Sequence, residues 1–172
     1  SQVVVIDTNL PAESIAWLAD NCHAPIFADP VSTVKAEKLR PVLGKLHTLK
    51  PNRLEAELLS GVPITGTDSL HRAAQTLLET GLHRVFISLG ADGVYAADQS
   101  GSVTLPAPKA EMVSTTGCGD SFMAALTWAY LQGSDLERSA RAGLAASSLT
   151  MESAETIHPS MSEAELLRRM AL

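Results

Sequence analysis

The sequence lacks the features that mark several large classes of protein. Only two cysteines occur among its 172 residues, Cys22 and Cys118, and they lie far apart. They indicate neither a disulfide framework nor a zinc motif, and their scarcity favours a reducing cytoplasm. No apolar run approaches the roughly 20 residues that a membrane-spanning helix needs. Lys and Arg number 13 against 19 Asp and Glu, giving a net charge of −6, with no basic patch. We therefore expect neither a membrane partner nor a nucleic-acid partner.

The commonest nucleotide and nucleophile motifs are also missing from the chain. Neither the P-loop pattern nor the G-x-G-x-x-G fingerprint occurs, and G-x-S-x-G is absent as well. These absences argue against a P-loop NTPase, a dinucleotide-dependent dehydrogenase and an α/β hydrolase with a nucleophile elbow.

The order of the predicted elements indicates an α/β fold. Apolar residues make up 45% and charged residues 19%, as in ordinary globular proteins. Short apolar strands alternate with amphipathic helices through the first ninety residues, which predicts βαβ units and a mostly parallel, Rossmann-like sheet with helices on both faces. We expect strands at 3–7, 25–30, 47–52 and 84–90, an antiparallel edge pair at 93–98 and 101–107, and helices at 11–22, 34–46, 53–61, 68–81, 119–132, 135–151 and 162–171.

The stretch "STTGCGDSF", residues 114–122, carries the most chemical information. Glycines at the start of a helix let free backbone N–H groups approach an anion, usually a phosphate. Asp120 would repel a passively bound phosphate, but it suits a general base that takes a proton from an attacking hydroxyl. The amides of Gly117, Cys118 and Gly119 would then form an anion hole for the transferred phosphoryl group. The alternative is a tight glycine turn with Asp120 as a helix cap.

Two further motifs follow predicted strands, where ligands bind in sheets of this kind. "KPNRLE" places Asn52 and Glu55 on one face of a helix, where an amide and a carboxylate could hold hydrated Mg²⁺. A simple helix cap is the alternative. "SLGADG", residues 88–93, is a strand followed by a glycine turn, which alone is a weak signal. Asp7, Asn9 and Asp29 follow strands too, as turn caps or as contacts to substrate or Mg²⁺.

These motifs together resemble the ribokinase-like (PfkB-type) carbohydrate and nucleoside kinases. "STTGCGDSF" is similar to the family's D-T-x-G-A-G-D signature, "KPNRLE" to its N-x-x-E motif and "SLGADG" to its nucleotide-binding loop. The segments "VVVIDTNL", "FADPVS" and "HTLKPNRLEAELLSG" are most similar to a bacterial nucleoside kinase of this family. The resemblance implies ATP-dependent phosphorylation of a sugar or nucleoside hydroxyl, with ATP and Mg²⁺ as cofactors and a possible homodimer in the full-length enzyme.

The resemblance also assigns roles to individual residues. Asp120 matches the catalytic base, and Gly117, Cys118 and Gly119 match the anion hole. Asn52 and Glu55 match the pair that organises Mg²⁺ and phosphate. The residues that match the ATP-contacting positions are Asn52, Ser88, Gly90, Asp92, Gly93 and Gly119.

Two positions depart from the family's pattern. Cys118 replaces the usual alanine, and its place at a helix N-terminus could lower the pKa of its thiol. Ser114 replaces the usual aspartate that helps to bind a monovalent cation, so a K⁺ site at Ser114 and Thr116 is in doubt. Small residues on one face of the helix at 135–151 predict close helix packing. The alternative, which the resemblance implies, is that this face forms a flat surface beside the adenine of ATP.

The resemblance covers the whole chain but only part of the family's length. Residues 1–172 correspond to the C-terminal nucleotide-binding and catalytic portion, without the N-terminal sugar-binding half and lid. The chain begins at Ser1 without an initiator Met and enters a strand almost at once, so we expect an upstream portion; a processed natural start is the alternative. An active kinase and a nucleotide-binding piece without activity of its own both remain open.

Overall fold

A computed structural model describes residues 1–171. The chain divides into two compact units, each described here by itself. Unit 1 contains Ser1–Leu89 and Tyr95–Val103, and unit 2 contains Gly90–Val94 and the chain from Thr104 onward.

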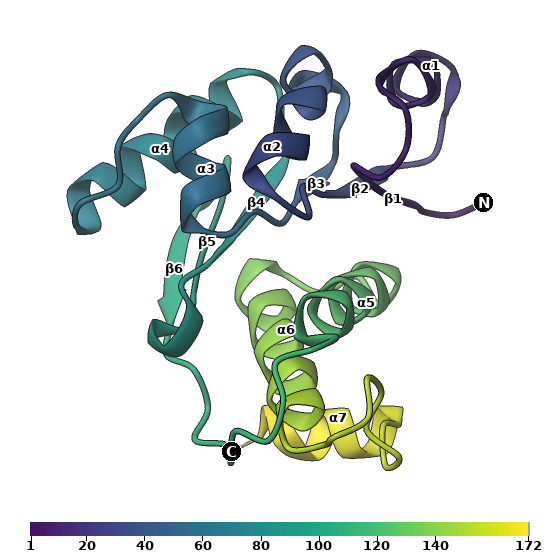
Figure 1. The fold of residues 1–172 in the computed structure, drawn as a ribbon, viewed down its shortest axis with the longest axis vertical. Coiled ribbons are helices and arrows are strands. Elements are labelled where there is room, and N and C mark those ends of the chain that lie inside the picture. Colours follow the sequence, from purple (N-terminus) through teal and green to yellow (C-terminus); the bar gives the residue numbers. More distant parts are fainter. Residues whose placement is uncertain (172) are drawn as a thin grey trace. The chain divides into compact units, whose positions relative to one another are not determined.

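A six-stranded sheet has its strands in chain order, from β1 to β6 (Figure 1). The first four strands are parallel, and β4, β5 and β6 form the expected antiparallel portion. The strands are β1 (Val4–Asp7), β2 (Ile26–Asp29), β3 (Thr48–Leu49), β4 (Arg84–Ser88), β5 (Val94–Asp98) and β6 (Gly101–Leu105). The prediction of a mostly parallel sheet flanked by helices is thus confirmed.

The helices of unit 1 bury their apolar sides in one core with the strands. Leu39, Leu49, Leu77 and Val85 are among its fully buried members. Its helices are α1 (Ala12–Asn21), α2 (Thr33–Ala36), the 3₁₀ helix η1 (Glu37–Lys45), α3 (Arg53–Ser60) and α4 (Thr67–Glu79). Pro41 lies inside η1. Because proline lacks a backbone N–H and clashes with the preceding turn, it disfavours a regular α-helix at this place.

Unit 2 is built from three helices, α5 (Cys118–Leu131), α6 (Leu136–Met151) and α7 (Glu163–Met170), preceded by the 3₁₀ turn η2 (Gly90–Asp92). Helices α5 and α6 lie side by side (Figure 1). A Cβ on Gly143 would lie 2.4 Å from Cε1 of Phe122, so only glycine allows this approach. The buried residues shared by the three helices are Ala125, Ala129, Ala142, Ala145, Ala146 and Leu166. The prediction of close packing by small residues is confirmed.

Candidate active site

The start of α5 holds the residues predicted to be the anion hole and the base. Gly117 is the N-cap residue, with φ of +82°, and α5 begins at Cys118. Asp120 lies in the first turn and is exposed. Because the first N–H groups of a helix have no partner within the helix, this turn can donate to an anion.

Gly117 is required by its surroundings as well as by its backbone angle. A Cβ at this position would lie 2.5 Å from the carbonyl oxygen of Thr156 and 2.8 Å from its Cγ2. The loop after α6 therefore lies directly against the N-cap of α5. Thr156 belongs to none of the sequence motifs, so its contact with Gly117 was not predicted.

Cys118 is held in place by α6. The hydroxyl of Ser147 donates to the carbonyl oxygen of Cys118 at 2.8 Å, and the thiol lies 3.6 Å from the carbonyl oxygen of Ser147. Burial raises the pKa of the thiol above its usual range. The expectation that the helix N-terminus lowers this pKa is therefore wrong, because burial removes water from the thiolate. The N–H of Cys118 donates to Thr115 at 3.3 Å.

A pocket of about 500 Å³ opens beside Asp120 within unit 2. Ala124 and Trp128 of α5 line it together with Ile157 from the loop after α6 and Leu166 of α7. Asp120 is thus among the residues that line a hollow with largely apolar walls.

Ser114 and Thr116, the doubtful cation-binding positions, lie in the turn that leads into α5. The N–H of Thr116 donates to the hydroxyl of Ser114 at 3.2 Å, and the N–H of Ser114 donates to the carbonyl oxygen of Met151 at 3.1 Å. The hydroxyl of Ser114 is thus engaged in ordering the turn, and it retains a second lone pair.

Asn52 and Glu55 form a reciprocal capping box at the start of α3 in unit 1. The side chain of Asn52 accepts the N–H of Glu55 at 2.9 Å, and Oε2 of Glu55 accepts the N–H of Asn52 at 2.8 Å. Glu55 is 3% exposed, and burial raises its pKa above the usual range while the bond from Asn52 opposes that effect. Asn52 and Glu55 therefore form a helix cap, and Oε1 of Glu55 is left over for another partner.

The structure adds Lys50 to this end of the sheet. Lys50 follows β3 and is only 7% exposed, and its Nζ lies 3.0 Å from Oδ2 of Asp29 at the end of β2. Oδ1 of Asp29 accepts the N–H of Val31 at 3.0 Å, so Asp29 also acts as a turn cap. Asp7 caps its turn in the same way through the N–H of Asn9, at 2.7 Å. In the sequence, Lys50 is marked only as the first residue of the "KPNRLE" motif.

The strand ends bring Ser88 next to Asn52, whereas the glycine turn belongs to unit 2. Ser88 pairs with Asn52 in an isolated parallel bridge, and its N–H donates to Pro51 at 2.9 Å. Gly90 and Asp92 are exposed in η2. The N–H of Gly93 donates to Gly90 at 3.1 Å, and a Cβ on Gly93 would overlap the carbonyl oxygen of Leu105.

The oxygen donors of Asn52 and Glu55 fit Mg²⁺ bound through water. Within residues 1–171, no group of three His, Cys, Asp or Glu side chains gathers to form a metal site. The amide oxygen of Asn52 and the one free carboxylate oxygen of Glu55 suit an ion that keeps several of its waters, as Mg²⁺ does.

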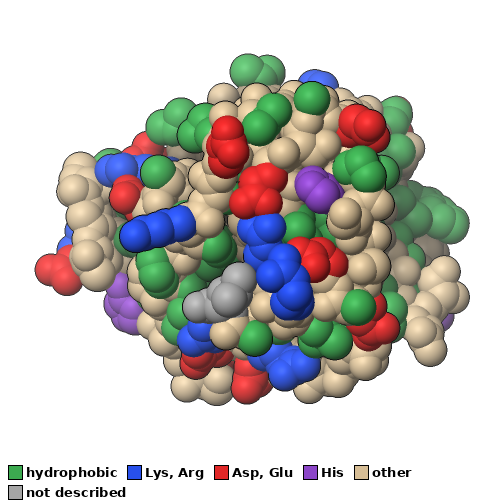
Figure 2. Space-filling view, turned by 90° about the horizontal axis from the view of Figure 1, so that it is seen from below, with side chains coloured by type: hydrophobic (Ala, Val, Ile, Leu, Met, Phe, Trp, Pro, Cys, Tyr) green, Lys and Arg blue, Asp and Glu red, His purple; other side chains and the backbone are tan. Residues whose placement is uncertain are grey.

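Charged side chains of both signs are interspersed on the face drawn in Figure 2, where basic groups lie next to acidic ones. No helix within residues 1–171 has the length and apolar character needed to cross a membrane. Both cysteines are free.

The fold and these motifs define a class: the sugar and nucleoside kinases with a ribokinase-like fold. The chain belongs to the pfkB family of carbohydrate kinases, whose pattern matches residues 7–164.

Several relatives support this assignment. Pseudouridine kinase of Escherichia coli is 39% identical over 169 residues, which cover 97% of this chain and 54% of the relative. A protein of Clostridium perfringens described as a sugar kinase has a structure that matches 99% of this chain and 54% of its own, with a TM-score of 0.95 and 35% identity. Phosphofructokinase-2 of Escherichia coli in complex with potassium matches 98% of this chain and 56% of its own, with a TM-score of 0.84 and 25% identity. The chain thus spans about half the length of these relatives.

Proposed function

We propose that the chain is the C-terminal catalytic portion of an ATP-dependent kinase that phosphorylates the 5′-hydroxyl of pseudouridine. The observation that carries the proposal is the place of Asp120. It lies in the first turn of α5, just after left-handed Gly117, and it is one of the residues that line a pocket. A base at the end of an anion-binding turn suits phosphoryl transfer to a hydroxyl.

The reaction assigns one step to each part of this turn. Asp120 accepts the proton of the acceptor hydroxyl while that oxygen forms a bond to the γ-phosphorus of ATP. The bond between this phosphorus and ADP breaks, and ADP leaves with the electron pair. The N–H groups of Gly117 and Gly119 donate to the oxygens of the transferred group and stabilise their charge. The N–H of Cys118 joins them by exchanging its 3.3 Å bond to Thr115 for a phosphate oxygen.

The nucleotide and metal roles follow the family assignment. Asn52 and Glu55 would hold Mg²⁺ through water, and the ion would neutralise phosphate charge. Ser88, Gly90, Asp92 and Gly93 would contact ATP. Stimulation by K⁺ at Ser114 and Thr116 is tested by comparing rates in potassium and sodium salts.

Pseudouridine is proposed because of the similarity to pseudouridine kinase, which spans nearly the whole chain. Another sugar, such as ribose or a fructose phosphate, is the second candidate, because a phosphofructokinase shares the fold. A cytoplasmic location and a homodimer of the full-length enzyme are further parts of this proposal.

The test is ADP release by the full-length enzyme with pseudouridine, uridine and ribose as acceptors. We expect turnover with pseudouridine and a rate lower by about 10²–10⁴-fold with Asp120→Asn. Use of ribose alone would keep the family and reject this substrate.

The 172-residue chain by itself is expected to bind ATP weakly and to show no useful turnover. Orientation of the acceptor supplies a large part of the rate, and the family's sugar-holding motif is not among these residues. Rapid turnover by this chain alone in the same assay would contradict that expectation.

A further inference from the structure

The loop at 153–161 lies against the proposed anion hole, and nothing in the mechanism above explains what fixes it. Thr156 on this loop occupies the space beside Gly117 that a Cβ would need. Thr156 and Ile157 are both exposed, so burial of their side chains does not hold the loop. Ser153 is buried at one end of the loop, and Met161 packs against the core shared by the three helices at the other.

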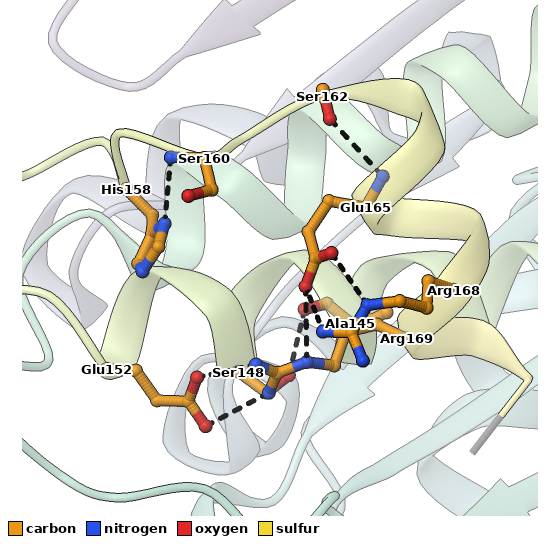
Figure 3. A network of polar contacts seen from close by, with 9 residues as sticks. All are labelled: Ala145, Ser148, Glu152, His158, Ser160, Ser162, Glu165, Arg168 and Arg169. Carbon is orange, nitrogen blue, oxygen red and sulfur yellow. Dashed lines mark hydrogen bonds and ion pairs between the residues drawn. The ribbon is translucent and has the colours of Figure 1, made fainter.

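A bidentate ion pair joins the residue that precedes this loop to the helix that follows it (Figure 3). Nη1 and Nη2 of Arg169, in the last turn of α7, donate to the two carboxylate oxygens of Glu152 at 3.0 and 2.6 Å. Glu152 directly follows α6, so the pair ties the start of the loop to α7. The side chains of Arg169 and Glu152 are only 15% and 25% exposed. Such a shielded fork holds its geometry better than an exposed pair does.

The same end of α6 also holds the segment that leads into α5. The N–H groups of Val113 and Ser114 donate to the carbonyl oxygen of Met151 at 2.9 and 3.1 Å. The N–H of Glu111 is a further hydrogen-bond partner of the Glu152 carboxylate. The end of α6 thus holds both segments that meet at Gly117. One is the loop at 153–161, which follows α6, and the other is the segment that leads into α5.

We propose that Arg169 is a positioning residue, which fixes the loop at 153–161 through Glu152 and thereby sets the conformation of Gly117 in the anion hole. This inference rests on the proposed function for its catalytic consequence. Its structural part, the coupling of α7 to the start of α5, stands by itself.

Arg168 provides a matched control on the same helix. It is the neighbouring arginine, pairs with Glu165 one turn away, and its side chain is 59% exposed. Arg169→Met and Arg168→Met therefore remove the same group from adjacent positions. Arg169→Lys keeps the charge without the fork and serves as the milder variant if Arg169→Met does not fold.

The first measurement is amide hydrogen exchange of the full-length protein. With Arg169→Met we expect exchange to rise several-fold both at 153–161 and at 113–121, and to stay unchanged in α4. Arg168→Met should leave all three segments as in the wild type, and Arg169→Lys should fall in between. Faster exchange at 153–161 without any change at 113–121 would overturn the coupling, as would no change at all.

The second measurement is steady-state kinetics with the acceptor that supports turnover. Misplacement of a catalytic group by about 1 Å can cost on the order of 100-fold. We therefore expect Arg169→Met to lower kcat roughly 10- to 100-fold with KM within about twofold, and Arg169→Lys to restore part of that loss. An unchanged kcat would refute the inference. If the wild type transfers no phosphate to any acceptor, the proposed function fails, and the exchange data still decide the coupling.

Discussion

Asn52 and Glu55 each accept the other's backbone N–H, at 2.9 and 2.8 Å. This reciprocal cap uses one carboxylate oxygen of Glu55 and leaves the other free. The pair is therefore fixed without any ligand, so a hydrated metal ion bound as proposed would require no ordering of these side chains.

Glu55→Gln separates the cap from the charge. Glutamine can still accept the N–H of Asn52, so we expect little change in the melting temperature. Loss of the negative charge should raise the Mg²⁺ concentration that gives half the maximal rate. Glu57→Gln is the control, because Glu57 lies on the same helix and accepts the N–H of Ile64 instead. If the wild type and both variants show the same Mg²⁺ dependence, Glu55 acts only as a helix cap.

Asp120→Asn tests the general base in the full-length enzyme. We expect kcat to fall about 10²–10⁴-fold while ATP still binds, because only the proton acceptor is removed. Binding is measured by calorimetry and turnover by ADP release. Asp135→Asn, at the N-cap of α6, should leave both unchanged, since Asn caps a helix as well as Asp does. A variant at position 120 with normal kcat would exclude the assignment.

Gly117→Ala should damage both stability and activity. The residue would be forced into a left-handed conformation and would overlap the carbonyl oxygen of Thr156. Gly133→Ala is the matched control, with φ of +69° and no heavy atom within 4 Å of the added Cβ. The control should cost about 1–2 kcal/mol, from backbone strain alone, and keep full activity. Stability is measured by denaturant unfolding. Equal losses in the two variants would show that Thr156 moves aside without a cost in stability.

The folded chain should lose stability in mild acid through His47. Burial lowers the pKa of this imidazole to about 4 from 6.5, with further lowering by His83 and Arg84. The folded state therefore binds fewer protons than the unfolded state between these values, and stability falls as the pH drops from about 6.5 towards 4. With allowance for screening by solvent, we expect an effect on the order of 1–2 kcal/mol.

His47→Gln should flatten this part of the stability curve. His23→Gln, which changes an exposed histidine, should leave the curve as it is. Thermal unfolding at several pH values between 4 and 7 supplies the comparison. A His47→Gln curve parallel to the wild type would exclude this histidine as the cause.

The element order and the motif positions were predictable because they depend on local patterns. Runs such as "VVVID" and "RVFIS" contain the β-branched residues of buried strands, and glycine or a capping side chain limits the helices that follow. Local reasoning placed the start of the helix at 68–81 on Asp68, but α4 begins at Thr67. The N-cap is Gly66, and the hydroxyl of Ser69 accepts its N–H at 3.0 Å.

The contacts that shape the candidate site were beyond prediction for a physical reason. Thr156 meets Gly117, and Arg169 meets Glu152, only after three helices have packed together. Lys50 stood inside a recognised motif, yet its burial depends on Asp29 from another strand. No periodicity or spacing rule encodes such pairs, because side-chain partners across elements are set by tertiary packing.

The order of strands in the sheet has a consequence for how the chain forms. Since β1 to β6 are neighbours in the order of synthesis, each strand from β2 onward leaves the ribosome after the strand with which it pairs. The parallel strands are joined through one or two helices each, and pairing never waits for a segment beyond the next strand. The sheet can thus grow during translation one strand at a time, and the edge that each strand from β2 to β5 presents stays unpaired only until the next strand is made.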